Sequence, residues 1–300
     1  MGKFNDALEK IEKAKPLTVL SPAKSSAQQA PTKTSTEVPI VAPPEPSGVQ
    51  GQAPAKTAPP TGQYALNRID SHLVVYHDPT SVESEIFKIL RNAILFPKQG
   101  EPPVSIMVTS AIPGDGKSFV AANLAVSIAQ GVEEYVLLMD CDMRRSTVHR
   151  QFGFDDNIPG LSEYLSKGVP LPSLLKKTVV DKLTILPGGS IPPNPSELLS
   201  SQAMKHLLEQ VKNRYTDRYV IVDSPPPQLT AETTALANYV DAIIVVVRYA
   251  ATPKEMVKEL VEKMGKEKVI GVVMNGYRVP TTERYGYGRY KSYEKRYKKS

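Results

Sequence analysis

The sequence predicts an α/β domain in which a mostly parallel β-sheet is covered by helices on both faces. Continuous apolar runs of strand length alternate with segments in which apolar residues recur at helical spacing, as in sheets that are buried on both sides. One such run is followed by a glycine-rich loop and an apolar helix, and two others end in aspartate. These features indicate an open sheet with a ligand site at the carboxyl ends of its strands.

The elements of this domain follow from apolar periodicity. Residues 73–76 suggest a short strand or an extended lead-in. Residues 81–95 are expected to be helical, because apolar side chains recur there every three or four positions. The other expected elements are strands at 104–109, 135–140, 183–186, 219–223, 241–248 and 269–275, and helices at 118–130, 162–166, 171–177, 195–215, 232–239 and 253–265. Thr252 is the expected N-cap of the last helix.

Proline and charge predict the regions outside the domain. Ten of the 27 prolines lie between positions 16 and 60, where too little apolar surface can be buried to offset the ordering entropy. We expect a short amphipathic helix within residues 1–15, a disordered linker over 16–63, the folded domain over 64–276 and a disordered tail over 277–300. The first helix carries Phe4, Leu8 and Ile11 on one face and is either a fraying segment or a docking element.

Composition excludes several classes of protein. No apolar run approaches the roughly 18 residues of a membrane span, and the charged start of the chain lacks the apolar core of a secretory signal. The single cysteine, Cys141, excludes a disulfide framework and a cysteine zinc cluster. We therefore expect a cytoplasmic protein.

The strongest motif is Ala-Ile-Pro-Gly-Asp-Gly-Lys-Ser, which begins at Ala111. It matches the Walker A pattern, with Ala111 in place of the first glycine, and it joins a predicted strand to a predicted helix. Gly114 and Gly116 let backbone N–H groups turn towards phosphate oxygens. Lys117 supplies charge to the β- and γ-phosphates, and the Ser118 hydroxyl suits Mg²⁺. The domain is therefore predicted to be a P-loop NTPase.

Acidic residues follow two of the predicted strands. Asp140 and Asp142 come at the end of one strand, and Asp223 ends another. Since ligands of open α/β sheets bind at the carboxyl ends of the strands, these carboxylates are expected to converge near Ser118, where they would suit Mg²⁺. For any one of them the alternative is a loop cap.

These motifs resemble those of the bacterial tyrosine kinases (BY-kinases). Residues 136–144, which end in Asp-Cys-Asp-Met-Arg, are similar to the Walker A′ motif of that family, and residues 220–226 are similar to its Walker B motif. Further similar segments are residues 159–162, 186–189 and 193–199, so the resemblance spans about residues 75–275. It is strongest to the cytoplasmic kinases of capsule and exopolysaccharide systems, which act with a separate membrane activator.

The resemblance implies an ATP-dependent protein-tyrosine autokinase that regulates exopolysaccharide or capsule biosynthesis and export. Lys117, Asp140 and Asp142 would be catalytic, with Asp140 orienting or deprotonating the attacking phenol. Ser118, Asp142 and Asp223 would hold Mg²⁺ directly or through water. The expected contacts to ATP are Gly114, Asp115, Gly116, Lys117, Ser118, Phe119 and Asn275, the last near the adenine.

The resemblance also implies partners. These are a membrane-embedded polysaccharide chain-length or co-polymerase protein as activator, further copies of this chain and a tyrosine phosphatase, at the inner face of the plasma membrane. Glu85, Lys88 and Arg91 match a Glu-x-x-Arg-x-x-Arg pattern that the family uses in subunit contacts, with Lys88 in place of the first arginine. Lysine lacks the planar fork of arginine for bidentate contacts. The alternative for this helical stripe is a solvated face.

The tail combines tyrosines with positive charge. Its five clustered tyrosines are Tyr285, Tyr287, Tyr290, Tyr293 and Tyr297, and they are the expected phosphate acceptors. Residues 277–300 hold eight basic and two acidic side chains. Their net charge of +6 equals the net charge of the whole chain. Each phosphate adds about −1.5 to −2 charge, so three or more would cancel or reverse this charge. Basic and aromatic residues also suit nucleic acid or an anionic membrane, although nucleic acid is not the expected partner.

Two other functions fit the same motifs. A positioning ATPase of the partition or septum-site kind would hydrolyse ATP without tyrosine kinase activity. Such proteins carry lysine where Ile112 stands and lack a tyrosine-rich tail, so both features favour the kinase. A silent nucleotide-binding adaptor is the third reading, and the intact Lys117, Ser118 and Asp223 argue against it.

Overall fold

The computed structural model describes residues 18–19, 69–213, 217–225 and 232–277 of the chain. The chain divides into two units, one formed by Met1–Ser21 with Tyr64–Ser300 and the other by Pro22–Gln63. The predicted N-terminal helix, nearly all of the linker and the five clustered tyrosines lie outside the described residues. The domain boundaries at 64 and 276 therefore stay predictions.

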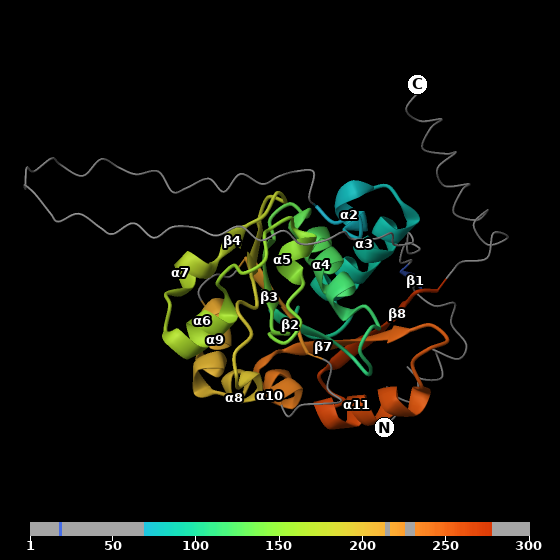
Figure 1. Ribbon diagram of the computed structural model, residues 1–300. Helices are drawn as coiled ribbons and strands as arrows, with labels where there is room; N and C mark the ends of the chain where they lie inside the picture. The colour runs from blue at the N-terminus through green and yellow to red at the C-terminus, as the bar shows by residue number, and fades with distance from the viewer. Residues whose placement is uncertain (1–17, 20–68, 214–216, 226–231, 278–300) are drawn as a thin grey trace, which may run out of the picture. The chain divides into compact units, whose positions relative to one another are not determined.

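A single sheet runs through the first unit (Figure 1). The strand order is β1-β8-β7-β2-β6-β3-β5-β4, and only β4 is antiparallel to its neighbour. The strands are β1 (Thr18–Val19), β2 (Ser105–Ser110), β3 (Tyr135–Asp140), β4 (Lys176–Lys177), β5 (Leu183–Leu186), β6 (Arg218–Asp223), β7 (Ala242–Arg248) and β8 (Val269–Asn275). The predicted class, an α/β fold with a mostly parallel sheet, is confirmed.

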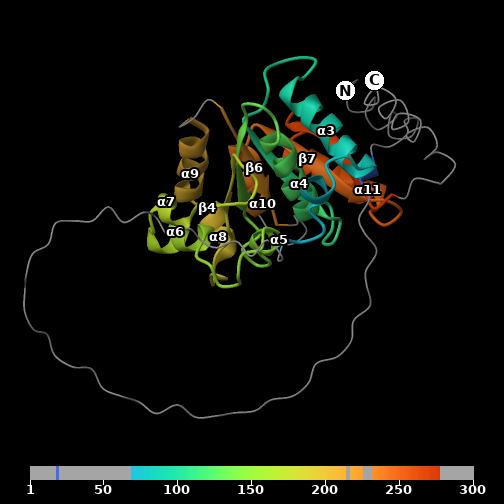
Figure 2. The same ribbon diagram turned by 90° about the horizontal axis from the view of Figure 1, so that it is seen from above.

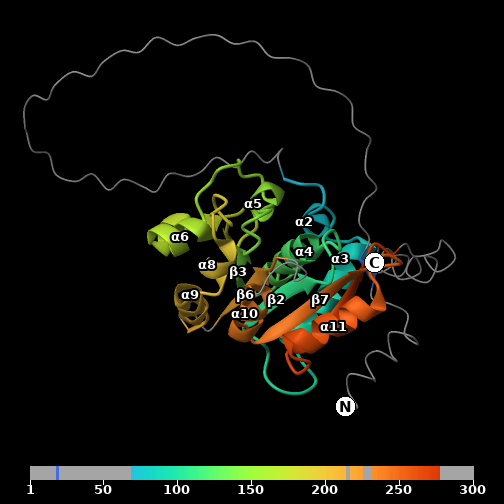
Figure 3. The ribbon, with the colours of Figure 1, turned by 60° about the horizontal axis from the view of Figure 1, so that its bottom comes forward.

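Helices pack on both faces of this sheet (Figures 2 and 3). Ile106 and Val108 of β2 pack with one set of helices, and Met107 between them packs with the other set. The first set is α2 (Val74–His77), α3 (Val82–Leu95), α4 (Lys117–Ala129) and α5 (Val148–Gln151). The second set is α6 (Leu161–Lys167), α7 (Leu171–Leu174), α8 (Pro195–Leu199), α9 (Gln202–Asn213), α10 (Glu232–Tyr239) and α11 (Lys254–Met264). Burial on both faces explains why the strands are continuous apolar runs.

Val74–His77 form the helix α2, so the strand or lead-in predicted over residues 73–76 is wrong. The Val75 N–H donates to the Asn123 side chain at 3.1 Å, and the Asn123 amide donates to the His72 carbonyl at 2.9 Å. Leu73 and Val75 are also buried in the cluster around α4. These contacts to α4 hold α2, which has only four residues, and a local sequence pattern does not contain them.

Two other predicted helices have different ends. The long helix expected over 195–215 is divided into α8 and α9, because the Ser201 hydroxyl donates to the Leu198 carbonyl and accepts from the Met204 N–H. The helix expected over 171–177 ends after one turn, and Lys176 then pairs with Ile185 of β5 as part of β4. The short helix α5 has no counterpart among the predicted elements.

Within the described ranges, no helix has the length and apolar character of a membrane span.

Candidate active site

The glycine-rich loop connects the carboxyl end of β2 to Lys117, the first residue of α4. Gly114 and Gly116 have φ angles of 88° and 95°, in the left-handed region that glycine adopts without strain. The Asp115 carboxylate closes the loop from within, since it accepts hydrogen bonds from the Ile112 N–H and the Thr252 hydroxyl. Burial raises the pKa of Asp115, and these bonds oppose the rise. Both carboxylate oxygens of Asp115 are therefore used in hydrogen bonds that hold the loop.

Arg248, the last residue of β7, and Thr252, which follows that strand, hold this loop in place. Thr252 is not the N-cap of α11, as its sequence position predicts, because Pro253 occupies that position. The Thr252 hydroxyl instead accepts from the Arg248 N–H at 2.8 Å and donates to Asp115 at 2.7 Å. The Arg248 guanidinium donates to the Gly114 carbonyl at 3.1 Å. Sequence reasoning missed both roles, because no spacing along the chain connects positions 248 and 252 to the loop.

Asn275, at the end of β8, lies directly against the glycine-rich loop. Its side-chain amide donates to the Asp115 carbonyl at 2.8 Å, and a Cβ atom at Gly116 would lie 2.0 Å from the same nitrogen. The other side-chain atom, Asn275 Oδ1, is buried and has no hydrogen-bond partner. A buried acceptor without a donor is costly, so this oxygen is suited to an incoming N–H group such as that of a nucleobase.

Alanine at Gly116 is expected to destabilise the domain more than alanine at Gly114. Both changes force a side chain into the left-handed region, at a cost of about 1 kcal/mol. Only the Gly116→Ala side chain also displaces Asn275, because nothing lies within 4 Å of a Cβ at Gly114. Loss of the bond from Asn275 to Asp115 should add about 1–2 kcal/mol. Urea unfolding without nucleotide measures the difference, and equal losses for the two variants would contradict it.

Three aspartates gather beside Lys117. Asp140 and Asp223 are register partners at the ends of the adjacent strands β3 and β6, and both are fully buried. Asp142 is also buried, and its carboxylate lies 3.0 Å from the Lys117 ammonium group. The predicted convergence of these residues at one edge of the sheet therefore exists in the folded chain. Within the described residues, no group of three or more His, Cys, Asp or Glu forms a closed metal site.

The charges in this cluster oppose one another. Burial and then the charge of Asp223 raise the pKa of Asp140 to about 7, although bonds from Ser146 and the Val148 N–H oppose the rise. Burial likewise raises the pKa of Asp223 to about 6, against the effect of Lys117. Burial alone would lower the pKa of Lys117, but Asp223, Asp142 and Asp140 raise it overall. The cluster holds more acid than one lysine can neutralise, so it is suited to a further cation.

Asp223 is the member of the cluster with free ligand capacity. Both of its carboxylate oxygens are buried without a well-formed hydrogen bond, although the Ser118 hydroxyl is near enough to lower its pKa. A P-loop magnesium ion takes few ligands from the protein and keeps waters and phosphate oxygens as the rest. The orphaned oxygens of Asp223, with Ser118 close by, therefore fit such an ion.

Asp140 has a structural role that the sequence offered only as an alternative. One of its oxygens accepts hydrogen bonds from the Ser146 hydroxyl at 2.8 Å, the Thr147 N–H at 3.0 Å and the Val148 N–H at 3.1 Å. The other accepts only the Asp142 N–H, at 3.1 Å. Asp140 thus fixes the turn that leads into α5 and still has one oxygen with free acceptor capacity. Sequence reasoning did not identify Ser146, because its hydroxyl reaches Asp140 only through the fold of the turn before α5.

The other segments that resemble the kinase family lie around this turn. Gly160 packs on the Pro187 carbonyl, and the buried Glu163 accepts from the Gly160 N–H at 2.8 Å and from the Ser190 hydroxyl. These bonds favour the charged form, so the pKa of Glu163 is lowered although burial opposes this.

Arg144 links the same turn to two helices. Its guanidinium donates to the Ser196 hydroxyl of α8 at 3.1 Å and lies 3.6 Å from the buried carboxylate of Glu232 in α10. Ser196 also donates to Glu232. The turn that carries Asp140 and Asp142 is therefore fixed from two further elements.

Other predicted site residues lie apart from this cluster. The partly buried Phe119 ring packs edge-on against Phe87 of α3. On α3, Lys88 pairs with Glu85 at 2.7 Å, and Arg91 donates to the Ser127 carbonyl of α4 at 3.0 Å. These three side chains thus have partners within the chain. The five clustered tyrosines lie outside the described residues.

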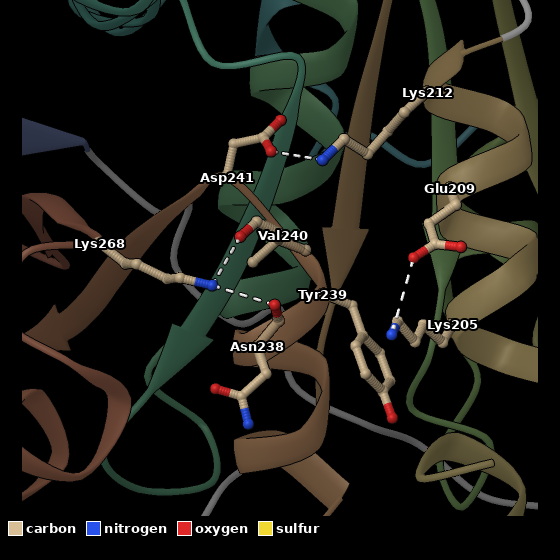
Figure 4. A pocket seen from close by; sticks show the side chains of 8 residues that line it. All are labelled: Lys205, Glu209, Lys212, Asn238, Tyr239, Val240, Asp241 and Lys268. Carbon is tan, nitrogen blue, oxygen red and sulfur yellow. Dashed lines mark hydrogen bonds and ion pairs between the residues drawn. The ribbon is translucent and has the colours of Figure 1, made fainter. Parts of the chain in front are cut away.

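A pocket of about 460 Å³ lies at the amino ends of the strands, opposite the glycine-rich loop (Figure 4). Lys268 donates there to the carbonyls of Asn238 and Val240, and Lys212 pairs with Asp241. Both lysines are therefore already engaged in contacts within the chain.

The comparisons with known proteins agree with this geometry. The ParA family model, described as NUBPL iron-transfer P-loop NTPase, matches residues 103–285. The tyrosine-protein kinase YwqD of Bacillus subtilis is 37% identical over 223 residues, which are 74% of this chain and 92% of YwqD. The tyrosine-protein kinase Wzc of Salmonella typhimurium is 32% identical over 224 residues, but these are only 31% of Wzc and 73% of this chain. The kinase domain of the Escherichia coli tyrosine kinase ETK has a TM-score of 0.64 at 29% identity, covering 73% of this chain and 87% of that domain.

Proposed function

The chain belongs to the family of bacterial tyrosine kinases, and we propose that it is an ATP-dependent protein-tyrosine autokinase that regulates capsule or exopolysaccharide production and export. The observation that carries the proposal is the contact of Lys117 with Asp142 at 3.0 Å beside the orphaned oxygens of Asp223. This arrangement combines a phosphate-binding cation with acids that fit a metal ion. The proposed cofactors are ATP and Mg²⁺, on a fold that binds nucleotides.

The residues of the glycine-rich loop would bind the phosphates. Backbone N–H groups from Gly114 to Ser118 would donate hydrogen bonds to the phosphate oxygens at the N-terminus of α4, and Lys117 would exchange Asp142 for phosphate. Mg²⁺ would neutralise charge on the phosphates, held by Ser118, Asp142 and Asp223 directly or through water. Asn275, with its unpartnered Oδ1, would contact the adenine.

Asp140 would orient the attacking phenol or accept its proton. Its pKa near 7 suits a general base at neutral pH, and one of its oxygens keeps acceptor capacity. The fixed turn that leads into α5 would hold this oxygen in position. A phenol has a pKa of about 10, so it enters the site protonated and needs such an acceptor.

The proposed acceptors are the five tyrosines from Tyr285 to Tyr297, which lie in a basic segment of the sequence. The proposed partner is a membrane-embedded co-polymerase that activates the kinase and brings it to the inner face of the membrane. We also propose that copies of the chain associate through Glu85, Lys88 and Arg91. A tyrosine phosphatase would remove the phosphates. The in-chain bonds of these three residues would have to coexist with, or yield to, a contact with another copy.

Phosphate mapping tests the proposed activity. The full chain is incubated with ATP and Mg²⁺, alone and with membranes that contain its co-polymerase, and its C-terminal peptides are analysed by mass spectrometry. We expect phosphate on the tyrosines from Tyr285 to Tyr297 in the wild type and none in Lys117→Met. A variant with these five tyrosines changed to phenylalanine should still bind nucleotide. Hydrolysis without phosphotyrosine would instead support a positioning ATPase, and neither activity with the activator present would support an adaptor.

Phosphorylation of the tail is expected to weaken self-association. Three or more phosphates would cancel or reverse the charge of +6 carried by residues 277–300. Sedimentation velocity of phosphorylated and phosphatase-treated protein measures the effect, with the five-phenylalanine variant as control. Identical association of the two forms would contradict this expectation.

A further inference from the structure

A groove with both apolar and charged lining residues lies at the amino-terminal end of the sheet, away from the active site. It has a volume of about 640 Å³ and is bounded by the end of α3, the loop that follows it and the start of β8. Its apolar lining includes Ala93, Pro97, Pro102, Pro103 and Ile270. Lys212 and Asp241, which pair with each other, separate it from the pocket of Figure 4.

The surfaces around this groove are uncovered in the described part of the chain. Ile270 is 49% exposed, and Phe96, at the end of α3, is 73% exposed. Ile89 and Phe96 share a helical face with Ala93, which lines the groove. A Cβ atom at Gly271 would meet nothing within 4 Å, so the sheet next to Ile270 is open as well.

The edge of β8 is also only partly paired. β7 pairs with one side of β8 from Val269 to Asn275, but on the other side β1 pairs only with Met274 and Asn275. No other described strand contacts that side. An apolar strand edge left open in this way is a site for aggregation, and natural proteins cover such edges.

The position of β1 indicates what covers this edge. Thr18 pairs with Met274 in parallel register, so a strand continued before Thr18 would run back along β8 towards Ile270. Pro16 has no N–H group and ends the possible ladder there. Ile270 and Met274 are four positions apart along the strand, or about 13 Å, and a helix of about 12 residues before Pro16 would span about 18 Å. The segment before β1 therefore reaches the whole groove.

We propose that residues 3–15 of this chain dock as an amphipathic helix in the groove between α3 and the start of β8. Phe4, Leu8 and Ile11, which share one face of that helix, would contact Ile270 and the exposed side of α3. The occupant is this segment of the same molecule, because β1 already fixes its end beside β8. The proposal does not depend on kinase activity.

Hydrogen exchange of the full chain without nucleotide tests the docking. Leu8→Ser is compared with Lys13→Ser, which places the same side chain on the opposite face of the helix. We expect Leu8→Ser to speed exchange about tenfold in residues 4–11 and in residues 269–273, and Lys13→Ser to change neither. The change lies outside the folded core, so it should not unfold the domain.

A second pair of variants tests the groove itself, with one change in the groove and one control outside it. Ile270→Asp should likewise expose residues 4–11 to exchange, whereas Val132→Asp, at another exposed apolar position, should not. Wild-type residues 4–11 that exchange as fast as those of Ile270→Asp would overturn the proposal. Protection that appears only at high protein concentration would also overturn it, since the occupant would then be a second copy.

Discussion

Lys117→Met is expected to abolish tyrosine phosphorylation and to destabilise the domain. Lys117 is the only cation at the three buried acids in the described structure, and it lies 3.0 Å from Asp142. Without it, phosphoryl transfer loses its phosphate-binding charge, and a loss of at least about 10³-fold is expected. Removing one partner from a buried ion pair costs about 3 kcal/mol, because the remaining charge is left uncompensated. Quantitative phosphotyrosine analysis and urea unfolding measure the two effects.

The stability loss of Lys117→Met should depend on pH. Asp140 and Asp223 have pKa values of about 7 and 6 in the folded chain, above those of an unfolded carboxyl. The folded state therefore binds more protons than the unfolded state between about pH 4 and pH 7, and stability falls as the pH rises through this range. Without Lys117, the pKa values of Asp140 and Asp223 should rise further. At low pH both carboxyls are then protonated and no longer repel each other. The loss should be larger at pH 8 than at pH 5, and a loss that is equal at both values would contradict this account.

Asp223→Asn is expected to abolish activity but to stabilise the domain without ligand. The change removes a buried carboxylate whose oxygens have no hydrogen-bond partner. Burial raises the pKa of Asp223 to about 6, so its ionised carboxylate destabilises the folded domain at high pH. The remaining amide is also buried without partners, so the expected net gain is about 1–2 kcal/mol at pH 8. Urea unfolding at pH 8 measures this gain.

Two controls separate the effects of Asp223→Asn. At pH 5 the gain should shrink, because Asp223 is then protonated in the folded wild type. Addition of ATP and Mg²⁺ should stabilise the wild type and leave Asp223→Asn nearly unchanged, since the variant lacks the proposed metal ligand. A variant that is less stable than the wild type at pH 8 would show that Asp223 supports the fold rather than the ligand.

The two variants share the loss of activity and differ in the sign of their stability effects. Lys117 compensates the buried acids, whereas Asp223 adds to their repulsion. A purely structural role for the cluster would give both variants the same sign. Together, Lys117→Met and Asp223→Asn therefore test whether the three acids serve to bind a cation and destabilise the domain when no cation is bound.

The strands and the glycine-rich loop could be predicted because their signals are local. A run such as residues 242–247 is apolar at every position, since both faces of β7 are buried. Gly114, Gly116 and Lys117 lie within a few residues of one another, so one loop conformation explains all three. The convergence of Asp140 and Asp223 followed from the rule that parallel strands end at the same edge.

The residues that hold the site could not be predicted in the same way. Thr252 is 137 positions away from its partner Asp115, and Asn275 is 160 positions from it. The local sequence assigned Thr252 to a helix cap, because a threonine before a helix is usually one. The bond to Asp115 exists only because β7 and β8 end beside the glycine-rich loop.

The sequence by itself determined the class of fold, the positions of the six long strands of the sheet core, and the chemical types of the site residues, since each depends on short-range periodicity or a contiguous motif. Only the tertiary structure decided which side chains support the loop, which oxygen of Asp140 keeps free acceptor capacity, and that Asp223 has unpartnered oxygens. The physical reason is that hydrogen bonds and burial act between atoms that are close in space. Sequence spacing predicts such neighbours within one element but not across a sheet.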